Sequence, residues 1–461
     1  MKKQIFRACI ALSLAAAGTL QAGPHSYFLT EFTGLPGSAG PGVFDLNNFG
    51  VAAGSLGEQA AYWSSPTNAH LLAGLGDLYA AAFGINDVGN ACGKAFVDAE
   101  HQRAVYWEGT AAAQILPDLD TRPDMGNSTC NQLNGAAAKI GTSQTFSGDT
   151  HATAWDSANG IHDLGTVQGS GDSEAVGINA SGSIVGSSSF TYPDGGTAKH
   201  AVLWRNGSLM DLGTLGGRNS FADAINDAGQ IVGYADLNVG TSDSPAINHP
   251  ILWSSGASID LGLPAGFLRG DAYSINASGA IVGDAYNDPG NGARLADSHA
   301  VLWDQGEIVD LAELLRPQLP SNTLLVSAFK INDSGRILLF GFDHVGLVGH
   351  YYLATPISAT HVTLRSSENP AFKGDPVQFI AQVTADSGVI PHTSVSLRDG
   401  RTLLQVAPLD AQGIARFRPI SNLSLGTHQL RASFSGYEAF APSTSPVLNE
   451  VIRIKLIPLP R

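Results

Sequence analysis

The chain has 461 residues, 54 of them glycine and only 14% charged, a composition that suits a β protein with many tight turns. From Gly23 to Ala354 it holds 33 acidic and 12 basic residues, and a segment with a net charge of −21 repels nucleic acid and anionic membranes. From Thr355 to Arg461 the net charge is +3, and this shift in composition predicts a domain boundary near residue 355.

The first residues have the pattern of a secretory signal peptide. Lys2, Lys3 and Arg7 precede an apolar run that ends at Leu20, and Ala22 supplies the small residue of a cleavage site. We therefore expect residues 1–22 to be removed and the mature protein to be exported, to the periplasm or outside the cell. No later apolar segment is long enough to cross a bilayer, so we expect no membrane insertion.

A repeated unit runs from Val43 to Ala354. Its first anchor is the asparagine of turns such as "INDAG", found at Asn47, Asn86, Asn134, Asn179, Asn226, Asn276 and Asn332. Its second anchor comprises all six tryptophans of the chain, Trp63, Trp107, Trp155, Trp204, Trp253 and Trp303. A seventh copy of the second motif, "HYYLA" at His350–Ala354, has no tryptophan. Two motifs in constant phase indicate a repeat architecture.

Each unit contains four strand-like pieces joined by Gly, Asn, Asp and Ser turns. The best copy reads "SEAVGIN", "SIVGSSSF", "HAVLW" and "SLMDLGTL" between Ser173 and Leu215, with no sustained helical period. Four short antiparallel strands per repeat are typical of a propeller blade, so we predict an all-β fold with a seven-bladed β-propeller over residues 23–354. The small residues of the Asn-bearing strand place it innermost, and the "DLGTL" strand is then outermost.

The number of strands predicts how the propeller closes. The strand that follows each tryptophan occurs six times, ending with "EIVDLAEL" at Glu307–Leu314, whereas the other strand types occur seven times. The missing copy is "YFLTEFTGLPG" at Tyr27–Gly37, so the N-terminal strand is expected to pair into the last blade and leave no open edge. The alternative is an open solenoid of the same units.

The combination "HAVLW…DLGTLGG…AINDAGQIVG" resembles the bacterial extracellular HAF-repeat proteins. The likeness is clear over Ile161–Trp303 and weaker over Val43–Ala354. It implies an extracellular repeat protein and implies no particular activity.

Residues 355–461 read differently, with alternating apolar and polar residues and a turn every 8 to 12 residues, which is typical of a β-sandwich. Arg398–Gly400, Gly413, Leu425–Thr427 and Gly436–Tyr437 resemble the bacterial Ig-like repeat domains of surface proteins. We expect an Ig-like domain here, joined by a short linker at Ala354–Ala359.

Histidines recur in step with the tryptophans. His151, His200, His249, His299 and His350 share one position, and Asp163, Asp211, Asp260 and Asp310 share another. A ring of metal ligands is one interpretation. Because zinc ligands must meet near 2.1 Å of a single point, one copy per blade on outer strands cannot converge, and a hydrogen-bond network within each blade is the better hypothesis.

Two long loops, Ala235–Asn248 and Asp284–Ser298, hold the candidate calcium ligands Asp236, Asp243, Asp284, Asp288 and Asp297. They lack a regular ligand spacing. The "N-x-S" sequons at Asn179, Asn276 and Asn332 are explained by the turn chemistry of the repeat.

No nucleophile elbow, zinc-protease motif or phosphate-binding loop is present. We therefore predict a non-catalytic binding or scaffold protein without a cofactor, acting on a protein or glycan partner. The alternative is a glycan hydrolase or lyase at the mouth of the central channel. That enzyme needs a cluster of unrepeated acidic and aromatic residues. Only scattered unrepeated charges are evident in the sequence, at Glu100, Arg103, Arg269 and Arg294.

Cys92 and Cys130 are the two cysteines of the mature chain. They replace small or medium apolar residues at aligned, buried positions of consecutive units. An inter-blade disulfide, favoured by an oxidising compartment, and two separate buried thiols both fit this pattern.

Overall fold

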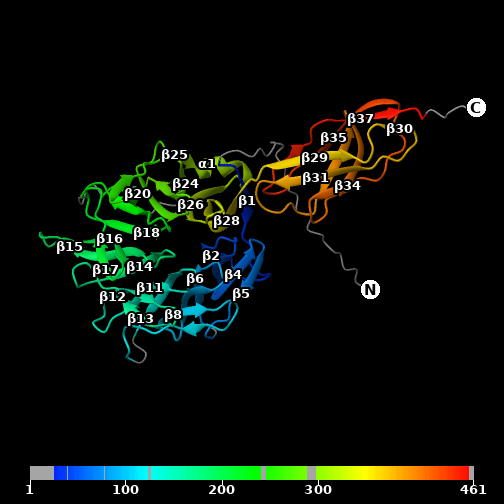
Figure 1. Cartoon of the computed structure of the whole chain (residues 1–461). Coiled ribbons are helices and arrows are strands. Elements are labelled where there is room, and N and C mark those ends of the chain that lie inside the picture. The colour runs from blue at the N-terminus through cyan, green and yellow to red at the C-terminus, as the bar shows by residue number, and fades with distance from the viewer. Residues whose placement is uncertain are drawn as a thin grey trace, which may run out of the picture. The chain divides into compact units, whose positions relative to one another are not determined.

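The computed structural model describes residues 25–38, 40–76, 78–122, 126–239, 246–287 and 297–455. The expected signal peptide at residues 1–22 and the calcium candidates Asp243 and Asp288 lie outside these ranges. The chain is all-β, with many small sheets and very little helix (Figure 1). It divides into two compact units, one of Leu29–Thr355 and one of Pro356–Arg461 together with the residues before Leu29.

The larger unit consists of seven open, four-stranded sheets. They are called sheets 1 to 7 here, in the chain order of the strand that precedes each repeated asparagine. Sheets 1 to 3 are β2 (Pro41–Leu46), β3 (Ala52–Leu56), β4 (Gln59–Ser65), β5 (Asn68–Leu71); β6 (Ala80–Ile85), β7 (Ala91–Phe96), β8 (Gln102–Trp107), β9 (Gln114–Ile115); and β10 (Ser128–Leu133), β11 (Lys139–Gln144), β12 (Thr150–Trp155), β13 (Ile161–Asp163).

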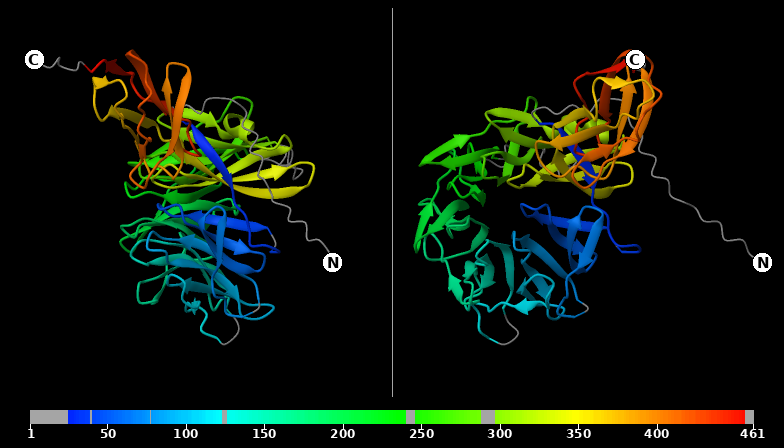
Figure 2. Two further views of the ribbon diagram at one scale, coloured as in Figure 1. Left: turned by 90° about the vertical axis from the view of Figure 1, so that its right-hand side faces the viewer. Right: turned by 45° about the vertical axis from the view of Figure 1, so that its right-hand side comes forward.

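Sheets 4 to 7 repeat this order. They are β14 (Ser173–Ile178), β15 (Ile184–Thr191), β16 (Thr197–Arg205), β17 (Ser208–Asp211); β18 (Ser220–Ile225), β19 (Ile231–Asp236), β20 (Asn248–Ser254), β21 (Ala257–Asp260); β22 (Arg269–Ile275), β23 (Ile281–Tyr286), β24 (Ser298–Asp304), β25 (Glu307–Asp310); and β26 (Thr323–Ile331), β27 (Ile337–Asp343), β28 (Val348–Pro356) with β1 (Tyr27–Glu31). The sheets succeed one another around a common centre (Figure 2). Strand β1 pairs with β28, at the place where the strand count puts it.

The repeated asparagines link neighbouring sheets in a closed cycle. Each side-chain Nδ2 donates to the main-chain carbonyl of the asparagine in the next sheet, over 2.9 to 3.2 Å, and Asn332 of sheet 7 donates to Asn47 of sheet 1. The Oδ1 atom of Asn47 accepts from the N–H groups of Phe49 and Val51 in its own turn. The asparagine therefore shapes the turn and also joins two sheets, and its buried, donating amide explains why the sequons recur.

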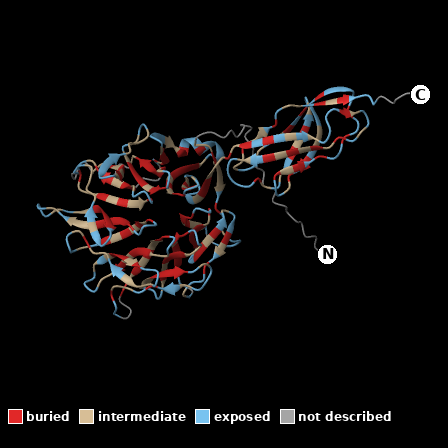
Figure 3. Ribbon diagram, viewed as in Figure 1, coloured by how far each residue is buried: buried red, intermediate tan, exposed pale blue. Residues whose placement is uncertain are grey.

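The tryptophans make a second tie between sheets. Each indole Nε1 donates, over 2.8 to 3.0 Å, to a carbonyl just after the outer strand of the preceding sheet; the acceptors are Thr33, Ala73, Pro117, Leu164, Leu212 and Gly262. Trp63 of sheet 1 reaches Thr33, which follows β1. Strand β1 therefore precedes sheet 1 in the same way that β5 precedes sheet 2. Buried residues run through every sheet, and exposed ones lie at the turns and on outermost strands such as β17 and β21 (Figure 3).

One predicted strand is too long. The strand expected over Glu307–Leu314 ends at Asp310, and helix α1 (Leu311–Leu315) with a 3-10 turn (Arg316–Gln318) follows. The Asp310 carboxylate accepts from the N–H of Glu313 at 3.0 Å and caps the helix, and the Leu-Ala-Glu-Leu-Leu segment has high helix propensity.

The smaller unit contains a three-stranded sheet of β29 (Thr360–Ser366), β31 (Phe379–Ala385) and β34 (Ile414–Arg416). Its six-stranded sheet consists of β30 (Ala371–Phe372), β37 (Leu448–Arg453), β35 (Gly426–Phe434), β32 (Ser394–Asp399), β33 (Thr402–Pro408) and β36 (Ser443–Thr444). Phe379, Phe417 and Phe434 are buried in its core. Only residues 357–359 lie between β28 and β29. The first half of the linker expected at Ala354–Ala359 therefore belongs to strand β28.

Candidate functional site: the unrepeated inner-strand residues

The first strand of every sheet carries a β-bulge at the residue three positions before the repeated asparagine. The bulged residues are Phe44, Phe83, Asn131, Val176, Asp223, Tyr273 and Phe329, and all seven are partly buried. A bulge re-aims a side chain and is common beside functional sites. Unlike the asparagines and tryptophans, these residues differ from sheet to sheet.

A cross-strand pair beside each bulge also differs between sheets. The pairs are Gly42 and Ser55, Ala81 and Lys94, Thr129 and Thr142, Glu174 and Ser187, Phe221 and Tyr234, Asp271 and Asp284, and Ser327 and Phe340. Directly paired residues share one face of a sheet, as do residues two apart along a strand. The bulged residues and these pairs together are called the variable face below.

Sheets 7, 1 and 2 give the variable face its aromatic part. The rings of Phe44 and Phe83 lie 5.3 Å apart across two sheets. The ammonium of Lys94 lies 5.7 Å from the centre of the Phe83 ring and 5.9 and 6.0 Å from those of Tyr79 and Phe96. At these distances the rings stabilise the cation through their π-electrons.

Sheets 4 to 6 give the variable face its acidic part. Asp271 and Asp284 are each 4% exposed, and both present an Oδ2 atom 3.1 Å from the hydroxyl of Tyr273. The rings of Phe221 and Tyr234 stack at 4.7 Å on the neighbouring sheet. Acidic and aromatic side chains are therefore brought together, although they come from strands far apart in the sequence.

Asp223 differs from the other carboxylates of this part. Its Oδ2 atom is buried and has no hydrogen-bond partner among the described residues. Burial, together with the nearby Asp271, Glu174 and Asp284 carboxylates, raises the pKa of Asp223 well above its ordinary range. Burial and the Asp271 and Asp223 charges likewise raise the pKa of Tyr234. The neighbouring carboxylates therefore disfavour the charged forms of both Asp223 and Tyr234.

At the asparagine end of the strands, a cavity of about 320 Å³ is lined by residues of all seven sheets. Lys330 pairs with the buried Asp45 at 2.7 Å, and Asp45 also accepts from the N–H of Ile85 at 2.8 Å. The polar atoms named here are paired within the protein, so this end serves mainly to hold sheets together.

The calcium candidates that the structure describes do not form a common site. Asp236 accepts two hydrogen bonds from Asn219, Asp284 faces Tyr273, and Asp297 is exposed. The described part of the chain contains no group of three or more His, Cys, Asp or Glu residues that could hold a metal ion.

The repeated histidines pair with carboxylates inside single sheets. His151, His200, His249 and His299 contact Asp163, Asp211, Asp260 and Asp310 at 2.9, 2.8, 2.9 and 2.7 Å. In sheet 7 His350 contacts Glu31 of β1 at 2.7 Å, and in sheet 2 Arg103 and Asp118 make the equivalent pair at 3.0 Å. Each histidine pair joins the third and fourth strands of its own sheet, whereas Asp118 lies just beyond the fourth strand β9, so the histidines do not converge. Of the other unrepeated charges, Arg269 donates to the carbonyl of Ala246, and Arg294 lies outside the described residues.

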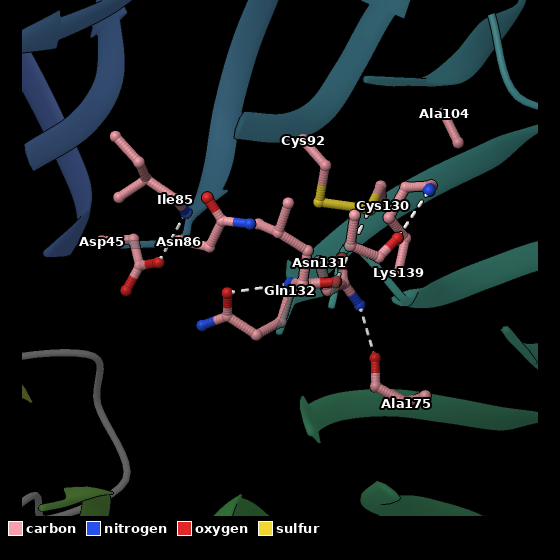
Figure 4. Close-up of a disulfide and its surroundings, with 12 residues drawn as sticks. Asp45, Ile85, Asn86, Cys92, Ala104, Cys130, Asn131, Gln132, Lys139 and Ala175 are labelled. Atoms are coloured by element: carbon pink, nitrogen blue, oxygen red, sulfur yellow. Dashed lines mark hydrogen bonds between the residues drawn. A yellow bond between two sulfur atoms is a disulfide. The ribbon is translucent and has the colours of Figure 1, made fainter. Parts of the chain in front are cut away.

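The structure joins Cys92 of β7 and Cys130 of β10 in a disulfide between sheets 2 and 3, with a Cα–Cα distance of 5.6 Å (Figure 4). Both cysteines are fully buried, in a cluster that includes Leu116, Leu133 and Trp155.

Sequence reasoning missed the variable face. Alignment of the units on the asparagine places Phe, Phe, Asn, Val, Asp, Tyr and Phe at the bulge, and this variation beside a constant residue was the available signal. The bulge itself has no sequence signature here.

Comparison with known proteins identifies one family. Residues 363–453 match the model of the bacterial Ig-like domain (group 3), and no HAF-repeat model matches the repeats. No curated protein matches the chain. Among solved structures, an extracellular domain assigned to a one component system of B. thetaiotaomicron is 8% identical, with 93% of this chain and 99% of that chain covered and a TM-score of 0.21. Sidekick-1 immunoglobulin domains 1-5 are 12% identical, with 93% of this chain and 99% of that chain covered and a TM-score of 0.19.

No helix in the described ranges is long and apolar enough to span a membrane.

Proposed function

We propose that the mature chain is a secreted, non-catalytic binding or scaffold protein. Residues 23–354 form a seven-bladed β-propeller of HAF-type repeats, closed by the N-terminal strand, and residues 355–461 form an Ig-like spacer. The propeller presents its variable face to a protein or glycan partner.

One observation carries this proposal. The residues that hold the sheets together repeat from sheet to sheet, whereas those of the variable face do not. Packing and hydrogen bonding impose the same requirements at equivalent positions of all seven sheets, so positions with a structural role should carry the same residue types. Aromatic and acidic side chains at only some of these positions are therefore best explained by a ligand that lacks the symmetry of the frame. The closed asparagine cycle supports the propeller.

A second candidate function rests on Asp223. A carboxyl group with a raised pKa beside the carboxylates of Asp271 and Asp284 is the arrangement that a general acid requires, and glycan hydrolases use such pairs. This would make the protein a glycan hydrolase or lyase.

A glycan array probed with the mature protein, together with binding assays against candidate protein partners, tests the proposal. Phe83→Ala and Tyr273→Ala change the variable face, and Ile259→Ser changes an exposed residue of an outer strand as a control. We expect a variable-face variant to weaken binding about tenfold and the control to bind normally. Normal binding by both variants would contradict the proposal. Release of reducing ends that is lost in Asp223→Asn would establish the enzyme instead.

A further inference from the structure

We propose that the acidic part of the variable face binds the cationic side chain, lysine or arginine, of a basic segment in a protein partner. This inference rests on the proposed function and narrows its partner from protein or glycan to protein. The site lies between sheets 5 and 6, around Asp223, Tyr273 and the stacked rings of Phe221 and Tyr234.

The first support is an unused acceptor. Asp223 Oδ2 is buried without a hydrogen bond in the described part of the chain, and such an atom costs free energy in the unliganded protein. Asp223 is the bulged residue of β18, and bulges are common beside functional sites. An ammonium or guanidinium group from a partner supplies the missing donor.

The second support is the charge around Asp223. Glu174 of sheet 4 and Asp271 and Asp284 of sheet 6 all act on it electrostatically, and each disfavours a further negative charge. A bound cation relieves this repulsion. The whole segment from Gly23 to Ala354 has a net charge of −21, which attracts a basic partner from a distance.

The third support is the pair of aromatic rings beside Asp223. Phe221 and Tyr234 stack with their ring centres 4.7 Å apart, and the ammonium of Lys199 lies 5.8 Å from the Phe221 ring. This ring therefore already accepts a cation from the protein itself. Aromatic faces beside carboxylates recognise ammonium and guanidinium groups more specifically than a carboxylate alone.

The test mixes the mature full-length protein with fluorescein-labelled hexalysine as the probe. Fluorescence anisotropy at 150 mM salt measures binding of the probe, and labelled hexaglutamate is the negative control. Asp223→Asn replaces a carboxyl group that can ionise beside a bound cation with a neutral amide, and it keeps the side-chain shape. Glu58→Gln makes the same replacement at an exposed turn of sheet 1. We expect Asp223→Asn to weaken hexalysine binding about tenfold or more, and Glu58→Gln to change it by less than about twofold. Circular dichroism checks that both variants are folded.

Equal affinities of the wild type and Asp223→Asn would overturn the inference, as would equal losses in both variants, because attraction by net charge then explains the binding. A melting temperature raised by 2 mM Ca²⁺ in the wild type but not in Asp223→Asn, without hexalysine binding, would also overturn it and identify a metal site. If hexalysine does not bind while Phe83→Ala or Tyr273→Ala still abolishes binding of another ligand, this inference fails and the proposed function stands.

Discussion

The side-chain amide of Asn332 donates a hydrogen bond of 2.9 Å to the main-chain carbonyl of Asn47, a residue 285 positions earlier. This bond completes the asparagine cycle, and it lies beside a second tie in which the N–H of Asp333 donates to the side chain of Asn48 at 2.9 Å. Further out, the indole of Trp63 in sheet 1 donates to the carbonyl of Thr33, which follows β1 of sheet 7, at 2.9 Å. The first and last sheets are thus tied both at the repeated asparagine turns and near their outer strands.

Asn332→Ala should destabilise the larger unit by about 3 kcal/mol. The substitution removes one of the two hydrogen bonds that the buried carbonyl of Asn47 accepts, and it leaves the N–H groups of Ser334 and Arg336 without their side-chain acceptor. Urea unfolding followed by tryptophan fluorescence measures the loss, because all six tryptophans lie in this unit. Asn68→Ala, at an exposed position, is the control. Equal stabilities of the two variants would show that the cycle contributes little.

Deletion of Tyr27–Pro36 should lower the free energy of unfolding by at least about 5 kcal/mol. It removes the buried ring of Phe32, the acceptor of the Trp63 indole and the partner of His350. A chain that begins at His25 is the control. Thermal unfolding compares the two, and an unchanged melting temperature in the deletion would argue against closure by the N-terminal strand.

Most of the frame could be predicted from the sequence because the frame repeats. The phase of Asn226 and Trp253 in one unit predicts four strands, and seven copies make the pattern independent of any single residue. Helix α1 was missed for the opposite reason. It occurs once, and Asp310, which aligns with the aspartates of other units, there caps a helix instead of only pairing with a histidine.

The variable face could not be predicted in the same way. Phe44 and Asp223 are aligned in the repeat, but a bulge depends on how two strands pair and not on local propensity. Nor does the sequence reveal that Asp271, Asp284 and Tyr273 meet, because cross-strand register decides which residues become neighbours. The sequence shows that the residue three positions before the repeated asparagine varies. Only the structure shows that this residue forms a bulge and which side chains it meets.

The Cys92–Cys130 disulfide should form when the chain folds in an oxidising compartment. Alkylation of the denatured, unreduced mature chain should then add no label, and two labels should appear after reduction. Closing a loop of this length, with a sequence separation of 38, corresponds to about 4 kcal/mol of stability. Reductant should therefore lower the melting temperature of the wild type and leave that of a Cys92→Ala, Cys130→Ala double variant unchanged. Two labels without reduction would mean free thiols.

The smaller unit should lose stability as the pH rises above about 6.5. His428 Nδ1 lies 2.5 Å from Asp399 and Nε2 lies 2.9 Å from the carbonyl of Ser424, so both ring nitrogens donate and the imidazole is charged. Burial lowers the pKa of His428, but the hydrogen bonds to Asp399 and Ser424 outweigh burial and raise it overall. Burial also raises the pKa of Glu450, which faces His428 across the strands.

The sign of the effect follows from these two shifts. A folded-state pKa above the unfolded one gives stability that is complete below the unfolded pKa, about 6.5 for histidine, and is lost as the pH rises through the folded pKa. Glu450 acts in the same direction from about pH 4.5 upward. Scanning calorimetry of the intact protein between pH 5 and 9 should show this decline in one transition, and His428→Gln should flatten it above pH 6.5. A transition that gains stability over this range would contradict the assignment.

Asp223 of strand β18 and Asn226, which directly follows that strand, test most directly whether repeated positions build the frame and unrepeated ones bind. Asn226 is repeated and donates to the carbonyl of Asn276, and Asp223 is unrepeated and lies three residues earlier. The measurement is the free energy of unfolding in urea for Asn226→Ala and Asp223→Asn. We predict a loss of about 3 kcal/mol for Asn226→Ala. For Asp223→Asn we predict no loss or a gain, because a buried, repelled carboxyl group becomes a neutral amide. A loss in Asp223→Asn as large as that in Asn226→Ala would contradict this division of roles.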